Sequence, residues 1–144
     1  MRALLDVNVL IALLDAAHAF HQRAHEWWAK NSSRGWAGCP LVENGVVRIM
    51  VNPGYSATRR FHAEEIVNAL SGFVGATDHE FWPDSLTLRD SKSFAPDRIH
   101  GGRQLTDLYL LALASRHGGR LATFDQGIPL SSVRTAKPSN LVVL

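Results

Sequence analysis

Residues 1–15, MRALLDVNVLIALLD, place two polar side chains inside an otherwise apolar segment. Asp6 follows a short run that predicts a buried strand, and Asn8 lies within the next run, which predicts a helix over 7–14. A buried carboxylate without a partner is costly and tends to take up a proton. The rest of the chain must therefore supply something that holds Asp6 in place.

The composition is that of an ordinary soluble globular protein. The 144 residues suffice for one domain with a sizeable core, and 46% of them are hydrophobic and 19% charged. No apolar run approaches the ~20 residues that cross a bilayer, and acidic residues interrupt any signal-peptide core. The net charge of +2 does not by itself indicate nucleic acid. The single cysteine, Cys39, agrees with a cytoplasmic protein, and we expect it to be buried and inert.

Short strands are expected to alternate with helices along the chain. The predicted strands are 2–5, 36–39, 81–82, 121–124 and 141–144, the last at an edge, and the predicted helices are 7–14, 20–30, 40–50, 58–70 and 106–116. This alternation predicts a three-layer α/β/α sandwich on a short, mainly parallel sheet, with residues 1–144 forming a single domain.

Four carboxylates are expected at one edge of this sheet. Asp6 and Asp125 end predicted strands. Glu43 and Asp107 lie in the first turns of predicted helices. Thr106 is the cap candidate of the helix that carries Asp107. Ligands of such sheets bind beyond the carboxyl ends of the strands. Each acid alone has an ordinary explanation as a cap, a helix-dipole partner or a turn residue. Those explanations do not account for four acids at the same edge.

Electrostatics gives this cluster a chemical meaning. Two carboxylates about 5 Å apart repel by roughly 3 kcal/mol at an effective dielectric constant of 20. A cluster of Asp6, Glu43, Asp107 and Asp125 should therefore be partly protonated, be unstable, or hold a hard cation. Oxygen ligands without Cys or His favour Mg²⁺ or Mn²⁺ over zinc. The sequence thus predicts a divalent metal site formed by these four acids.

Four segments resemble a known family, the PIN-domain ribonucleases, and specifically the VapC toxins of bacterial toxin–antitoxin pairs. The segments are LLDVNVLIALLD, CPLVENGVVRIM, QLTDLYLLALA and RLATFDQGI, in the family's order and spanning nearly the whole chain. The resemblance implies a PIN-like fold in which the four acids are the family's quartet for one or two Mg²⁺ or Mn²⁺ ions. It also implies supporting polar roles for Asn8, Thr106 and Thr123.

The resemblance further implies an activity and partners. The expected activity is metal-dependent hydrolysis of RNA phosphodiester bonds, which leaves a 5′-phosphate and a 3′-hydroxyl. We assign Asp6 and Asp107 as the principal metal ligands, with Asp125 and Glu43 completing the site directly or through water. The expected partners are RNA, a cognate antitoxin protein that blocks the site, and a second copy of the chain in a homodimer.

Two arginine segments are candidates for substrate or partner contacts. Gly101-Gly102-Arg103 directly precedes the helix that carries Asp107, so Arg103 and free backbone N–H groups could contact a phosphate, with a solvated loop as an equal alternative. Arg59-Arg60, on a predicted helical face, is expected to be a solvated pair or an antitoxin contact rather than an RNA reader.

Histidine and tryptophan residues have ordinary explanations. His21 and His25 have an i, i+4 spacing that suits zinc on a helix, and His18 is nearby, but no further ligand is identifiable and surface histidines are expected. The tryptophans are expected in the core or in dimer contacts rather than as base-stacking platforms; they are Trp27, Trp28, Trp36 and Trp82.

Three other protein classes share features with the acidic motifs. The opening D-x-N-V-L is similar to the D-x-D-x-[TV]-L motif of haloacid-dehalogenase-type phosphatases, but Asn8 cannot act as an acid and no lysine follows a clear strand. A non-catalytic PIN module that binds RNA or a partner is disfavoured by the intact quartet. A DNA-directed flap nuclease would need a longer chain to thread DNA.

Overall fold

Five short strands form one sheet in which every neighbouring pair is parallel, in the order β3-β2-β1-β4-β5. The computed structural model describes all residues, 1–144. The strands are β1 (Ala3–Leu5), β2 (Trp36–Gly38), β3 (His79–Phe81), β4 (Arg120–Thr123) and β5 (Leu141–Val143). The register pairs Leu4 of β1 with Ala37 of β2 and with Leu121 of β4. The expected parallel sheet is confirmed, with β5 at one edge.

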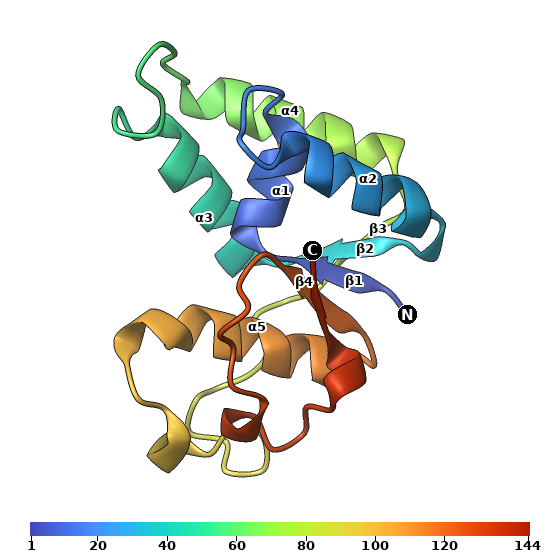
Figure 1. Cartoon of the computed structure of the whole chain (residues 1–144), viewed down its shortest axis with the longest axis vertical. Helices are drawn as coiled ribbons and strands as arrows, with labels where there is room; N and C mark the ends of the chain where they lie inside the picture. Colours follow the sequence, from blue (N-terminus) through green and yellow to red (C-terminus); the bar gives the residue numbers. More distant parts are fainter.

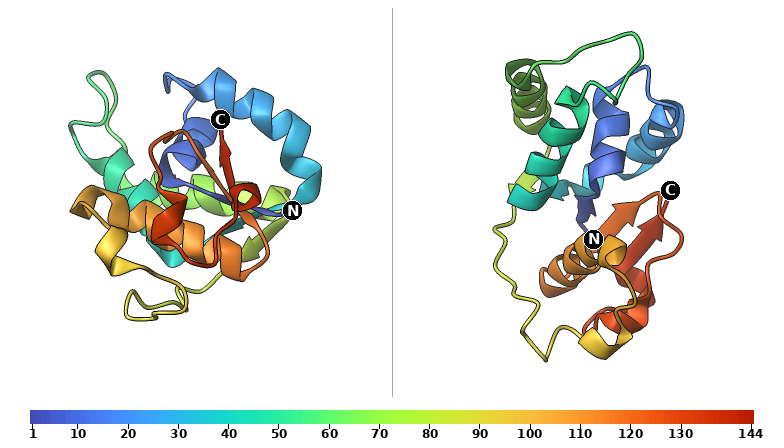
Figure 2. Two further views of the ribbon diagram at one scale, coloured as in Figure 1. Left: turned by 60° about the horizontal axis from the view of Figure 1, so that its bottom comes forward. Right: turned by 90° about the vertical axis from the view of Figure 1, so that its left-hand side faces the viewer.

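Helices cover both faces of the sheet and make three layers (Figure 1). The helices are α1 (Val7–Leu14), α2 (His21–Asn31), α3 (Pro40–Val51), α4 (Ala63–Ala76) and α5 (Leu105–Arg116). α1 to α4 lie on one side, and α5 lies on the other with the long segments around it, as the second view of Figure 2 shows most clearly. Five single 3₁₀ turns occur in the connections: 32–34, 96–98, 102–104, 130–132 and 138–140. The predicted α/β/α sandwich is therefore confirmed. None of the helices is both long and apolar enough to cross a membrane.

The chain reverses its direction across the sheet next to β1. It runs outward from β1 to β2 and β3, and then returns through α5 to β4 on the other side of β1. Because crossovers between parallel strands are right-handed, this reversal places α5 on the face opposite α1 to α4. The carboxyl ends of β1 and β4 consequently diverge at a topological switch point, where sheets of this kind bind ligands.

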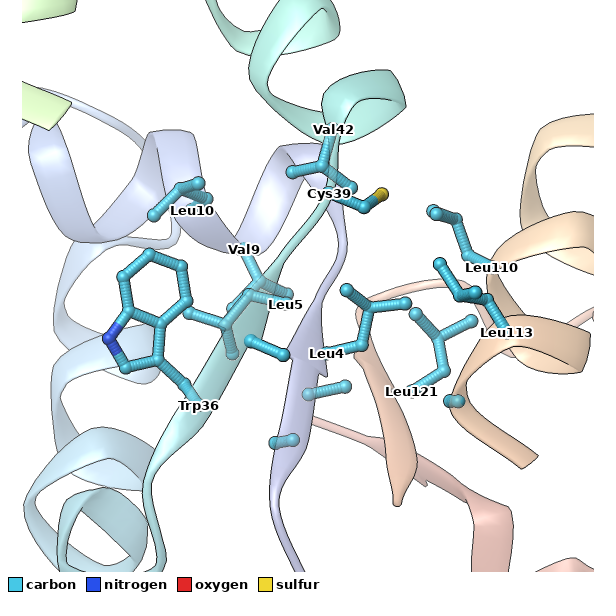
Figure 3. Close-up of a cluster of buried hydrophobic side chains, with 14 of the residues drawn as sticks. Leu4, Leu5, Val9, Leu10, Trp36, Cys39, Val42, Leu110, Leu113 and Leu121 are labelled. Carbon is cyan, nitrogen blue, oxygen red and sulfur yellow. The ribbon is translucent and has the colours of Figure 1, made fainter. Parts of the chain in front are cut away.

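The core forms around β1, whose three residues are all buried. Leu4 and Leu5 are fully buried and project to opposite faces of the sheet, because side chains alternate along a strand. Trp36 and Leu10 lie on the face of α1, whereas Leu113 of α5 lies across the sheet (Figure 3). A central parallel strand is covered on both faces and so needs apolar residues throughout.

Two sequence predictions in the middle of the chain are wrong. The helix expected over 58–70 is α4, which begins at Ala63, because the backbone N–H of His62 donates to Glu65 Oε1 (3.0 Å) at its start. The preceding residues form a turn, in which the Ser56 side chain accepts from the N–H of Arg59 (3.1 Å). Arg59-Arg60 therefore lies in a loop and not on a helix.

α4 also ends at Ala76, six residues beyond the expected end. The other differences are shifts of one or two residues. The strand expected at 81–82 is β3 (His79–Phe81), and Trp82 follows it with only 4% of its surface exposed. α5 begins at Leu105, after a 3₁₀ turn, so Thr106 lies within the helix and is not its cap. Cys39 is fully buried, and burial raises the pKa of its thiol to about 12, as expected for an inert cysteine.

A close contact between α1 and α3 gives a test of this packing. A Cβ on Gly45 would lie 2.8 Å from Val7 Cγ2, whereas a Cβ on Gly72 of α4 would meet nothing within 4 Å. We expect Gly45→Ala to lower the free energy of unfolding by about 1–2 kcal/mol through overpacking. Gly72→Ala should raise it by about 0.5–1 kcal/mol, because alanine favours a helix. Urea denaturation measures both, and equal effects would contradict the close packing of α1 on α3.

Candidate active site

Asp6 lies at the switch point, where it joins β1 to α1. It is only 7% exposed, and its Oδ1 accepts the N–H of Val7 (2.7 Å), so it is also the N-cap of α1. Its Oδ2 accepts a hydrogen bond from Thr123 Oγ1 of β4 (2.8 Å). Burial nevertheless raises the pKa of Asp6, and the charge of Asp125 adds to this effect. The carboxylate is held by hydrogen bonds and makes no ion pair with a basic side chain.

Thr123 connects the two carboxylates of the strand ends. Its side chain is fully buried, and its hydroxyl also accepts the N–H of Asp125 (3.0 Å). The Asp125 side chain in turn accepts the N–H of Gly127 (2.7 Å), which makes a turn directly after β4. The supporting role expected for Thr123 thus has a clear geometry, since one hydroxyl positions both Asp6 and Asp125.

Asp107 completes a group of three aspartates. It lies in the first turn of α5, and burial raises its pKa to about 7, with further contributions from the charge of Asp6 and from a hydrogen bond and the charge of Asp125. The hydrogen bond raises this pKa because the protonated Asp107 carboxyl can donate to Asp125. The structure therefore brings Asp6, Asp107 and Asp125 close enough to repel one another.

Glu43 lies on the same rim but faces a different neighbourhood. It belongs to the first turn of α3, and its pKa is raised by burial alone. A Cβ on Gly38 would lie 3.9 Å from Glu43 Oε1 and 3.1 Å from His79 Nε2, so both side chains surround this glycine. They line a cavity of about 530 Å³ between α3, α4 and β3. The buried Nε2 atom of His79 has no hydrogen-bond partner, and the sequence reasoning did not single out this histidine.

The other expected site residues are at the surface. Asn8, Thr106 and Arg103 are exposed, and their side chains make no hydrogen bond. Arg103 lies in the 3₁₀ turn before α5, next to Gln104, whose buried Oε1 is unpaired. These positions are compatible with contacts to a bound molecule but are not organised by the fold.

The zinc interpretation of the histidines is not supported. His21 Nδ1 contacts the carbonyl oxygen of Ala12 (2.7 Å), and His25 Nε2 contacts that of Leu13 (3.2 Å). Both carbonyls are near the end of α1, where backbone oxygens lack partners within the helix. The two histidines therefore attach α2 to α1, and His25 is exposed, as expected for a surface histidine.

The three aspartates fit a divalent cation by their chemistry. As the side chains stand, no three His, Cys, Asp or Glu residues converge in an arrangement that could hold an ion. The donors near the switch point are carboxylate oxygens alone, and their mutual repulsion is the interaction that a hard cation relieves. Protonation of Asp107, whose pKa is raised to about 7, provides the same relief in the metal-free chain. Mg²⁺ or Mn²⁺ suits such a donor set.

The chain is similar to a known protein family, to named sequence relatives and to a solved structure. Residues 3–133 match the PIN domain family. Ribonuclease VapC44 of Mycobacterium tuberculosis is 43% identical over 144 residues, which is all of both chains, and Ribonuclease VapC38 of the same organism is 41% identical over 99% of each. The solved structure of VapBC2 from Rickettsia felis bound to a DNA fragment from their promoter has a chain that matches with a TM-score of 0.49 and 16% identity, over 88% of this chain and 90% of that one.

The chain therefore belongs to the PIN-domain family and, within it, to the VapC ribonucleases. The resemblance noted from the sequence motifs is confirmed. The phosphatase alternative is wrong, because the acids belong to a PIN domain and not to a haloacid-dehalogenase motif.

The hydroxyl of Thr123 provides a test of the site geometry. Thr123→Val keeps the shape of the side chain but leaves Asp6 Oδ2 and the N–H of Asp125 without a partner. We expect the free energy of unfolding to fall by about 1–3 kcal/mol, as for other buried polar groups left unpaired. Thr123→Ser keeps the hydroxyl and should lose less. Urea denaturation at pH 7 measures the difference, and equal losses in the two variants would show that the hydrogen bonds contribute nothing.

The raised pKa of Asp107 predicts how stability changes with pH. Its value of about 7 in the folded chain exceeds the ordinary 3.8, so between these values the folded state binds more protons than the unfolded state. Stability of the metal-free protein should therefore fall as pH rises from about 4 to about 7, and level off above that range. Asp107→Asn should weaken this fall and raise the melting temperature at pH 8 by a few degrees.

Thermal unfolding in EDTA across this pH range measures the effect. Asp97→Asn removes the same charge at an exposed position and is the matched control. Parallel pH profiles for wild type and Asp107→Asn would contradict the repulsion at the site.

Proposed function

We propose that this chain, acting as a single nuclease domain, is a Mg²⁺- or Mn²⁺-dependent endoribonuclease that hydrolyses RNA phosphodiester bonds. The observation that carries the proposal is the group of three mutually repelling aspartates at the switch point of a VapC-family fold. A purely structural role would not require three neighbouring aspartates, because their repulsion lowers stability. A site that binds a divalent cation and, through it, a phosphate group does require them.

Asp6 and Asp107 are the proposed principal ligands, because Asp6 is buried, Asp107 is half-buried and each experiences the charge of another aspartate. When bound, a divalent ion neutralises phosphate charge and lowers the pKa of a water molecule. Asp125 is held by Thr123 and Gly127 in a position to orient that water. Glu43 lies on the neighbouring part of the rim, where its carboxylate can complete the site through water. No side-chain nucleophile is needed.

We also propose that the chain is the toxin of a toxin–antitoxin pair, inhibited by a cognate antitoxin protein, and that it forms a homodimer in the cytoplasm. Membership of the VapC family supports these partners. The fully buried, unpaired thiol of Cys39 agrees with a reducing compartment.

The test is incubation of the purified, antitoxin-free protein with total cellular RNA and Mg²⁺, followed by mapping of new 5′ ends. We expect discrete cuts that carry a 5′-phosphate and disappear in EDTA. Asp6→Asn and Asp107→Asn should lower the cleavage rate on the order of 100-fold or more, because each removes charge from the reacting centre. Asp97→Asn, which is exposed on the 3₁₀ turn 96–98, should cleave as wild type does.

Two results would count against the proposal. Cleavage that persists in EDTA or in both aspartate variants would exclude metal-dependent catalysis at this site. RNA that is bound but never cut by the folded wild type would favour the non-catalytic PIN module.

A further inference from the structure

A large aromatic side chain is exposed next to the end of β4, the strand that Asp125 follows. Phe20, the residue before α2, has 44% of its surface exposed. Its ring packs against that of Phe124, with ring centroids 4.9 Å apart and an interplanar angle of 46°. Phe124 is the residue between Thr123 and Asp125, and consecutive Cα atoms are only about 3.8 Å apart. The exposed ring is therefore coupled directly to the strand end that positions the site.

A guanidinium group accompanies this aromatic pair. Arg23 lies 5.7 Å from the ring centroid of Phe20 and 5.6 Å from that of Phe124. It donates a hydrogen bond to the backbone carbonyl of Leu144, which fixes its position over both rings. No Asp or Glu side chain pairs with Arg23, since the only ion pairs with carboxylate side chains are those of Arg2. Arg23 is therefore held over the two rings by Leu144 and not by the side chain of an acidic residue.

The packing of α2 does not explain why Phe20 is aromatic. The helix is attached to α1 by His21 and His25 and buries Ala24 completely, whereas much of the Phe20 ring faces solvent. Exposing a phenylalanine forgoes the stabilisation of burying it, about 1.5–3 kcal/mol. An exposed ring backed by a second ring and an arginine is the arrangement on which unpaired nucleobases stack.

We propose that Phe20, supported by Phe124 and Arg23, is a stacking platform for a nucleobase of single-stranded RNA that flanks the cleaved bond. The inference rests on the proposed ribonuclease function and adds a substrate preference to it. A base inside a duplex has both faces covered, so the platform selects unpaired segments. Arg23 would contribute through its position over the rings.

Binding is measured without cleavage, with a fluorescently labelled, single-stranded oligoribonucleotide in EDTA. We expect Phe20→Ala to weaken binding about tenfold, which is within the range found when stacking aromatics are replaced. Phe20→Trp should bind as tightly as wild type or more tightly. Phe20→Leu keeps an apolar side chain without a π-face, and it should bind as weakly as Phe20→Ala.

Phe61→Ala is the matched control. Phe61 also lies under an arginine, with Arg59 4.4 Å from its ring centroid, but it belongs to the loop before α4 and lines a cavity at the far end of α1 from Asp6. Its removal should leave RNA affinity unchanged. Melting temperatures of all variants, recorded in parallel, show whether any loss of binding comes from unfolding.

An abasic scan locates the stacked base. Removing one base at a time from the oligonucleotide should weaken binding to wild type at one position next to the cut and have little effect there on Phe20→Ala. Such non-additivity is the signature of a direct contact. With Mg²⁺ present, the same variant should raise KM more than it lowers kcat, because the chemical groups remain intact.

The outcomes separate this inference from the proposed function. If wild type cleaves RNA but Phe20→Ala or Phe20→Leu binds as wild type does, the platform is wrong and the nuclease stands. If Phe20→Ala instead changes only self-association, measured by sedimentation, the ring is a protein contact and the platform is likewise wrong. If wild type neither binds nor cuts RNA, both proposals fail.

Discussion

The hydrogen bond from Thr123 to Asp6 is the interaction on which the site depends. It joins the ends of β1 and β4 at the point where the chain reverses its direction across the sheet. The same hydroxyl accepts from the backbone of Asp125, so one buried side chain orients carboxylates that are 119 positions apart in the sequence. A parallel sheet with a reversed connection creates this meeting point, because both strand ends leave the sheet there.

Repulsion among the aspartates is a stability cost that the rest of the fold offsets. Asp107 cannot move away from Asp6 and Asp125, because the following residues of α5, Leu108 and Leu110 among them, are fully buried against the sheet. The buried apolar face of α5 thus keeps the Asp107 carboxylate close to the charges of Asp6 and Asp125, which repel it. Local conflicts of this kind concentrate at functional sites, since a relaxed cluster would have less affinity for a cation.

The surfaces on the two sides of the aspartates, at the carboxyl-end edge of the sheet, differ from each other. On the β2–β3 side, Glu43 and His79 line an open cavity whose walls include apolar residues of α3 and α4. On the β4 side, the ring of Phe124 supports the exposed Phe20. The carboxylates lie between a hollow with both apolar and polar walls and an aromatic surface, an asymmetry suited to a substrate with distinct parts on each side of the reacting bond.

The sequence alone determined the elements whose boundaries depend on neighbouring residues. The run before Asp6 predicted β1, Pro40 and Asn52-Pro53-Gly54 bounded α3, and His117-Gly118-Gly119 ended α5, because proline and glycine act on the local backbone. The spacing of acids along these elements was also enough to place all four at one rim. The start of α4 was missed because the side chain of Glu65, rather than apolar periodicity, sets it.

Only the tertiary structure decided how the side chains at that rim are arranged. It grouped three of the four acids, turned Glu43 toward His79, and paired Phe20 with a ring more than a hundred positions away. Orientation and pairing of this kind depend on contacts between distant segments, and no local pattern encodes them. The sequence could name the charged residues, but only the packed sheet could set the distances that make their charges interact.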